Sequence, residues 1–176
     1  MAAMDEPSRI DRKQFLRGDL SGQRSPLRPP WSLAEEAFVE ACERCDDCAS
    51  ACEEKIIRKG RGGFPEVDFT HGACTFCGDC LIACKGRALL GDVEDEASAW
   101  SLRAQIGTDC LAHKGVVCRS CGERCDTRAI RFQLQVGGAA KPELDEQLCN
   151  GCGECFAVCP TKAIRIAPME QFETAV

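Results

Sequence analysis

Apolar and polar residues alternate over two short stretches of the chain, residues 129–132 (Ala-Ile-Arg-Phe) and residues 163–166 (Ala-Ile-Arg-Ile). This period of two predicts half-buried β-strands. Further extended segments are expected at residues 65–68 and 142–145, where Pro-Glu-Val-Asp and Pro-Glu-Leu-Asp precede runs of cysteine. No apolar stretch approaches the roughly 18 residues of a transmembrane helix, so we expect a soluble chain that is not membrane-spanning.

Glycines between these segments predict where the chain turns. Gly60, Gly62 and Gly63 lie in one gap and Gly137 and Gly138 in another, as expected of hairpin-like returns. An acidic, irregular stretch at residues 91–96 separates the two glycine-rich regions, and we place a domain boundary at about residues 91–105. We expect Trp100 and Leu102 to form a short helix that packs the two parts together.

A cysteine motif is repeated along the chain and accounts for all 16 cysteines. Three copies read C-x2-C-x2-C-x3-C: Cys42, Cys45, Cys48 and Cys52; Cys74, Cys77, Cys80 and Cys84; Cys149, Cys152, Cys155 and Cys159. A fourth copy, Cys110, Cys118, Cys121 and Cys125, has seven residues instead of two after its first cysteine. The repeat therefore predicts four related binding sites.

Each copy continues in the same way beyond its last cysteine. A basic residue follows three positions later, and an apolar pair comes next; the basic residues are Lys55, Arg87, Arg128 and Lys162. We interpret each unit as a loop, a short helical turn and a strand. The fold class is thus α+β, with short helices and short strands around the cysteine sites. Since the chain has only 8 Phe, 2 Trp and no Tyr, its core is small and needs internal staples such as metal sites.

The spacing favours [4Fe–4S] clusters. Thiolates are the soft ligands that iron–sulfur clusters select, and in two-cluster ferredoxins the fourth cysteine of each such motif ligates the other cluster. Applied to this chain, the rule predicts four ligand sets: Cys42, Cys45, Cys48 with Cys84; Cys74, Cys77, Cys80 with Cys52; Cys149, Cys152, Cys155 with Cys125; and Cys110, Cys118, Cys121 with Cys159. We therefore expect four clusters, each tying together two distant repeats.

Other kinds of site fit the pattern less well. A third cysteine at the same short interval crowds a tetrahedral zinc site, and closely spaced cysteines make strained disulfides. At the stretched motif two interpretations stay open: a full cluster, or a labile or three-iron site in which Cys110 is not a ligand. His71 and His113 lie close to the motifs, but a loop histidine is more often a surface group than a ligand.

Charge and the remaining motifs exclude several functions. The net charge is −6 and no long Lys/Arg run is present, which argues against a nucleic-acid partner and for protein partners. No catalytic triad, phosphate-binding loop or dinucleotide motif is evident, so we do not expect an enzyme. Residues 12–17 (Arg-Lys-Gln-Phe-Leu-Arg) look like an export signal but lack the apolar region that must follow it. We read this segment as a retained basic arm, or as a chance resemblance in a polar tail.

The chain resembles the NapF family of ferredoxin-type proteins, which accompany periplasmic nitrate reductases. The resemblance is carried by the four motifs and by residues 28–32 (Arg-Pro-Pro-Trp-Ser), 58–65, 115–121 and 148–153. It implies a cytoplasmic protein that supports maturation of NapA, the catalytic subunit, by binding its unexported precursor. One departure is that proline follows only the last motif, at Pro160, which suggests exposed, labile clusters elsewhere. An electron-carrying ferredoxin that serves a redox partner is the alternative.

Together these features predict a domain plan. We expect a flexible basic arm over residues 1–30, a first bacterial-ferredoxin-like module over residues 31–92, a linker over residues 93–105 and a second, tandem module over residues 106–170.

Overall fold

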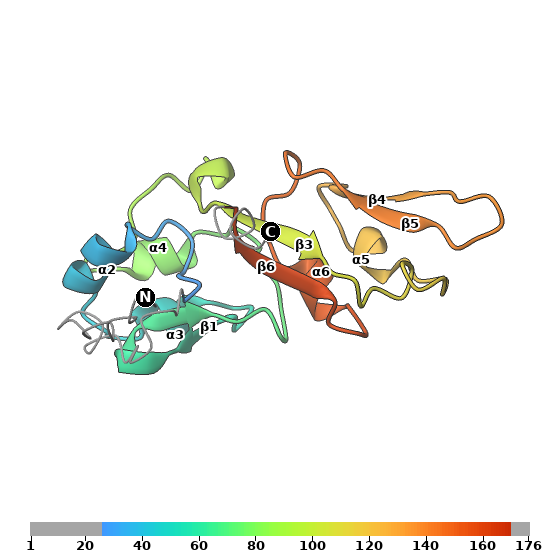
Figure 1. The fold of residues 1–176 in the computed structure, drawn as a ribbon. Coiled ribbons are helices and arrows are strands. Elements are labelled where there is room, and N and C mark those ends of the chain that lie inside the picture. Colours follow the sequence, from blue (N-terminus) through green and yellow to red (C-terminus); the bar gives the residue numbers. More distant parts are fainter. Residues whose placement is uncertain (1–25, 170–176) are drawn as a thin grey trace, which may run out of the picture.

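The computed structural model describes residues 26–169, in an arrangement that runs from the first cysteine motifs at one end to a long hairpin at the other (Figure 1). Most of the basic arm expected over residues 1–30 lies outside the described residues. Below, residues 26–92 are called the N-terminal half and residues 93–169 the C-terminal half. Across this range, no helix combines the length and apolar character that a bilayer span requires.

Each half contains one antiparallel hairpin. In the N-terminal half β1 (Ile57–Lys59) pairs with β2 (Pro65–Val67) through the turn η1 (Arg61–Gly63). In the C-terminal half β4 (Ile130–Gln133) pairs with β5 (Lys141–Leu144). Glycines in left-handed conformations form both turns, with φ of 66° at Gly62 and 73° at Gly137. The hairpin returns predicted from glycine and the four extended segments are thus confirmed.

A third pair of strands corrects one expectation. Trp100 and Leu102 do not form a helix: β3 (Leu102–Ile106) is a strand that pairs antiparallel with β6 (Ile164–Pro168). Leu102 and Ala104 are buried while Arg103 and Gln105 are more exposed, which is the period of two of a strand with one buried face. In the N-terminal half a single bridge between Ser32 and Leu89 takes the corresponding place.

Short helices lie inside the cysteine motifs. They are α3 (Asp47–Ala51), α4 (Asp79–Ala83), α5 (Ser120–Glu123) and α6 (Glu154–Ala157). The final cysteine of the motif directly follows α3 and α4 and comes two residues after the end of α5 and α6, as the repeat predicts. α3 packs against α4, and α5 packs against α6, so that helices of different motifs are brought together in pairs. Two other segments, α2 (Glu35–Ala41) and η2 (Glu96–Ser98), lie outside the motifs.

One continuous core joins the two halves. It contains Phe38 and Phe64 from the N-terminal half and Ile130 and Ile164 from the C-terminal half. Buried cysteines belong to the same cluster of side chains, so that much of the core consists of the walls of the cysteine sites. A core of this kind gains its stability when those sites are filled.

Candidate metal centres

The sixteen cysteines surround four cavities, each lined by four of them. Site A is lined by Cys42, Cys45, Cys48 and Cys84; site B by Cys52, Cys74, Cys77 and Cys80; site C by Cys125, Cys149, Cys152 and Cys155; and site D by Cys110, Cys118, Cys121 and Cys159. Every site combines three cysteines of one motif with the last cysteine of another. The structure thus brings together the same sets that the spacing groups.

The paired helices explain why the last cysteine crosses over. Cys52 ends α3 and Cys84 ends α4, and these two helices pack against each other. Each helix begins beside its own site and ends beside that of its partner. Because α5 and α6 pack in the same manner, Cys125 and Cys159 are exchanged between sites C and D.

The arrangement of the donors suits a polynuclear cluster rather than a single ion. All sixteen cysteines lie within residues 26–169 and are free thiols. In that part of the chain, no three His, Cys, Asp or Glu side chains lie close enough to hold one metal ion. His71 and His113 are exposed and line none of the four sites. Four soft sulfur donors around a cavity are the ligand set of a [4Fe–4S] cube, and the residues present fit that group.

Left-handed backbone turns shape three of the four cysteine loops. In each, positive φ occurs two residues after the first cysteine, at Arg44, Phe76 and Gly151. It occurs again one residue after the second cysteine, at Asp46, Gly78 and Gly153. Such turns direct backbone N–H groups inward, and the N–H of Phe76 lies 3.4 Å from Sγ of Cys74 as its donor. The stretched motif lacks this pattern, since Arg119 after Cys118 has φ of −132°. Site D is therefore built by a different loop.

A second left-handed position follows every motif. The basic residue three positions after each last cysteine has φ between 51° and 55°; these are Lys55, Arg87, Arg128 and Lys162. In three of the four, its N–H donates to the carbonyl of that cysteine, at 3.2, 3.0 and 3.2 Å for Lys55, Arg128 and Lys162. The turn redirects the chain from the last ligand into the next extended segment. The recurrence of a basic residue was the only sequence signal for this feature.

Burial favours the protonated form of several of the site thiols. Burial raises the pKa of Cys48 and of Cys74 to about 12, and that of Cys80 and of Cys121 to about 11. The pKa of Cys155 is raised in the same way, and neighbouring thiolates raise it further. Four thiolates held this close would repel one another, so a bound cation must neutralise them. Filling a site thus requires both metal charge and release of protons.

Hydroxyl groups accompany the sulfurs of the C-terminal half. Oγ1 of Thr127 lies 3.6 Å from Sγ of Cys125, and Oγ1 of Thr161 lies 3.8 Å from Sγ of Cys159. The N–H of Ala163 also donates to Sγ of Cys159 at 3.2 Å. Hydrogen bonds to cluster sulfurs are one of the means by which a protein adjusts reduction potential.

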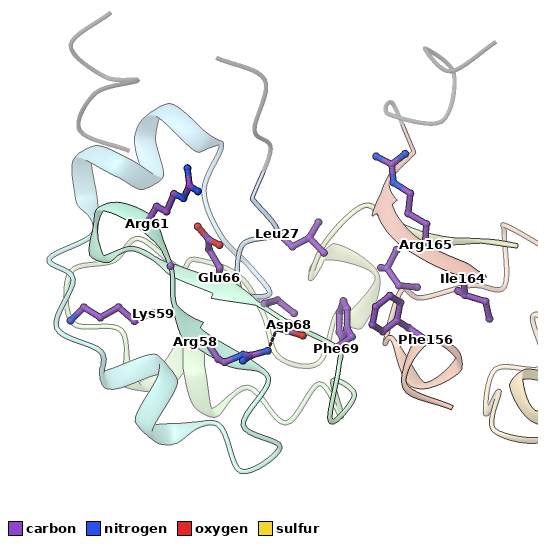
Figure 2. Close-up of a pocket in the computed structure, with 13 residues that line it drawn as sticks. Leu27, Arg58, Lys59, Arg61, Glu66, Asp68, Phe69, Phe156, Ile164 and Arg165 are labelled. Carbon is purple, nitrogen blue, oxygen red and sulfur yellow. Dashed lines mark ion pairs between the residues drawn. The ribbon is translucent and has the colours of Figure 1, made fainter. Parts of the chain in front are cut away.

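A larger cavity, of about 710 Å³, lies apart from the cysteine sites (Figure 2). Its walls come from β1 and β2 on one side and from β6 on the other, with Phe69 and Phe156 among its lining residues. Arg58 and Asp68 form an ion pair within its wall. It contains no cysteine and is not part of the candidate metal centres.

Comparisons with known proteins agree with this chemistry. A family profile described as a 4Fe-4S dicluster domain matches residues 116–163. The ferredoxin-type protein NapF of Escherichia coli K12 is 42% identical over 153 residues, which cover 87% of this chain and 92% of that protein. NapF of Haemophilus influenzae is 42% identical over 174 residues, covering 93% and 97%. The methylamine utilization ferredoxin-type protein MauM of Methylorubrum extorquens is 32% identical over 173 residues, covering 89% and 79%.

Proposed function

Because the chain belongs to the NapF family of ferredoxin-type iron–sulfur proteins, we propose that it carries four [4Fe–4S] clusters and supports maturation of NapA, the catalytic subunit of periplasmic nitrate reductase. In this proposal the chain acts in the cytoplasm, where thiols stay reduced, and binds the NapA precursor before export. Its role is one of binding and cofactor handling rather than catalysis.

The observation that carries the cluster proposal is the grouping of the cysteines. Sites A to D each take three cysteines from one motif and one from another, so that four complete sets of thiolates are formed with none left over. We assign the cysteines of each site as the ligands of one cluster. Two tandem modules follow from this assignment: sites A and B with α3 and α4 form the first, and sites C and D with α5 and α6 form the second.

A bound cluster supplies a one-electron redox centre or a group that can be passed on. The chain's own residues hold it with thiolates, direct backbone N–H groups toward it and limit its contact with water. Burial is incomplete: Cys45 and Cys77 are exposed, whereas Cys80, Cys121 and Cys155 are buried. At least sites A and B therefore have an open side.

Open cluster sites favour a role in maturation. Glu53, Lys85 and Asp126 stand where Pro160 stands after the last motif. These positions leave the chain after Cys52, Cys84 and Cys125 without the shielding that proline provides. A cluster that water and partners can reach is suited to assembly or transfer, and we propose that the NapA precursor docks at these loops.

A second candidate is electron transfer, and one contact favours it. The backbone N–H of Cys74 at site B donates to the carbonyl oxygen of Cys152 at site C, with 2.8 Å between the two atoms. Sites of the two halves are thereby held side by side, as a carrier that moves electrons along the chain would need.

Two measurements separate these roles. NapA should be purified from cells with and without this protein, and its iron, molybdenum and nitrate reductase activity compared. Maturation predicts inactive, cofactor-poor NapA in the deletion strain, which added reductant does not rescue. Pull-downs should also capture the cytoplasmic precursor in preference to mature periplasmic NapA. Fully loaded NapA in the deletion strain, together with equal capture of both forms, would remove the maturation role.

A further inference from the structure

The indole N–H of Trp31 is buried without a hydrogen-bond acceptor. Trp31 is 2% exposed, and among the described residues its Nε1 is the one buried side-chain nitrogen or oxygen that lacks a partner. An unsatisfied buried donor loses its hydrogen bonds to water without replacement, and native folds rarely keep one. A phenylalanine would fill similar space without this penalty. The indole N–H therefore needs an acceptor, and the side chains and backbone of the described residues supply none.

Trp31 lies in the wall of site B. The cavity lined by Cys52, Cys74, Cys77 and Cys80 is also lined by Trp31 and by the preceding Pro30. These two residues belong to the Arg-Pro-Pro-Trp segment at residues 28–31, which lies outside every cysteine motif. The fold has thus brought a residue from a separate part of the chain to one of the four sites.

The chain holds the indole in this place at a cost. Trp31 has φ of 59°, a left-handed and strained conformation that a bulky aromatic residue rarely adopts. The backbone N–H of Trp31 donates to the backbone carbonyl of Ala99 at 2.6 Å, and its backbone carbonyl accepts from the N–H of Leu90 at 2.8 Å. Gly91 leaves room for the ring, because a Cβ there would lie 2.2 Å from Cδ1 of Trp31.

The other tryptophan provides a contrast within the same chain. Nε1 of Trp100 donates to the carbonyl of Asn150 at 2.8 Å, so that its hydrogen bond is made inside the protein. Its ring packs edge-on against Phe69 and Phe76, with centroids 5.9 and 5.7 Å away. Trp100 is thus satisfied as a structural residue, whereas Trp31 is not.

We propose that the indole N–H of Trp31 is the hydrogen-bond donor to the sulfur atoms of the cluster at site B, and that it raises the reduction potential of that cluster above the value it would otherwise have. A reduced cluster carries one more negative charge than an oxidised one, so a donor to its sulfurs stabilises the reduced form more. Trp31 is then a positioning and tuning residue, not a ligand. This inference rests on the proposed filling of site B.

The test is an EPR-monitored redox titration of the anaerobically purified, full-length holoprotein. In Trp31→Phe we expect the ratio of reduced to oxidised cluster to fall about tenfold at a fixed solution potential, and at one cluster only. For a one-electron couple this corresponds to a reduction potential that is lower by ~59 mV. That signal is assigned to site B by its loss in Cys77→Ser. Trp100→Phe is the matched control: it should leave the potential at site B unchanged but lower the melting temperature, since it breaks a bond that the protein makes.

A second measurement detects the proposed contact directly in the wild-type protein and uses the two tryptophan variants to assign it. With ¹⁵N-labelled tryptophan, pulsed EPR of the reduced holoprotein should detect an indole nitrogen coupled to the site B signal, present in Trp100→Phe and absent in Trp31→Phe. If the protein contains its full iron and sulfide, and either the potentials in Trp31→Phe are unshifted or the nitrogen coupling is absent, the proposed role of Trp31 is overturned. The proposal that site B holds a cluster would then still stand. Wild-type protein without iron at site B would instead overturn the proposed function.

Discussion

The backbone N–H of Cys74 donates a hydrogen bond of 2.8 Å to the carbonyl oxygen of Cys152 and so joins the cysteine loops of sites B and C. Phe69 reinforces the same junction, because its ring fills the space beside Gly153, where an added Cβ would lie 2.1 Å from its Cδ1. The two halves of the protein therefore meet at their cysteine loops, and a change at this junction should affect both halves.

The first prediction concerns cooperative unfolding. Phe69→Ala removes a buried ring at the junction and should lower the free energy of unfolding by about 3–5 kcal/mol. It should also split a single thermal transition of the holoprotein into two, since the halves lose their shared packing. Phe38→Ala is the control, because Phe38 is fully buried within the N-terminal half. A single transition in Phe69→Ala would show that the junction does not couple the halves.

The second prediction tests the exchange of last cysteines. Cys84→Ala should remove or convert the cluster at site A while site B keeps its signal, and Cys52→Ala should do the opposite. The reason is that α3 and α4 each deliver their last cysteine to the neighbouring site. EPR and Mössbauer spectra of the two variants, compared with those of Cys45→Ala, which removes another cysteine that lines site A, provide the measurement. Self-contained motifs would give the reverse assignment.

The third prediction concerns the left-handed position after each motif. Arg87 is exposed and has φ of 55°, a conformation that only glycine adopts without strain. Arg87→Gly should keep or raise stability, by up to about 1 kcal/mol, whereas Arg87→Val should lower it by about 1–2 kcal/mol. Chemical denaturation of the holoprotein measures both. Equal stability of the two variants would contradict the role of backbone conformation here.

The fourth prediction is that clusters are lost faster as pH falls. Cys48 and Cys74 have pKa values raised to about 12 by burial, so without metal they are protonated at every pH from 6 to 8. Each ligand must give up a proton when a cluster binds, and acid therefore favours the metal-free state. Iron loss to a chelator under anaerobic conditions should be several-fold faster at pH 6 than at pH 8.

The chelator itself binds iron less well at pH 6, so its own titration works against the expected trend. A parallel incubation without chelator controls for spontaneous breakdown. Faster loss at pH 8 would contradict proton competition at the thiols.

The grouping of the cysteines around the four cavities was predicted from two sources: the short intervals place three cysteines of a motif together through local turns, and the rule for two-cluster ferredoxins supplies the fourth from another motif. Glycine likewise predicted both hairpins. The strand β3 was missed, although Leu102 and Ala104 alternate with polar residues, because the acidic stretch before it suggested a linker. The left-handed conformation of Arg87 was not predicted, because its only sequence signal is a recurring basic residue, and basic residues do not favour positive φ. The hydrogen bond between Cys74 and Cys152 depends on how the two halves pack against each other, and no local sequence pattern predicts that packing.

The central claim is that four sets of four cysteines hold four cubane clusters, and metal content tests it most directly. Anaerobically purified protein, analysed for iron, acid-labile sulfide and zinc, should contain about sixteen irons and about sixteen sulfides per chain, with Mössbauer parameters of [4Fe–4S] clusters. Zinc in place of iron and sulfide, disulfide-linked cysteines without metal, or a total near twelve irons with site D unfilled would contradict the account.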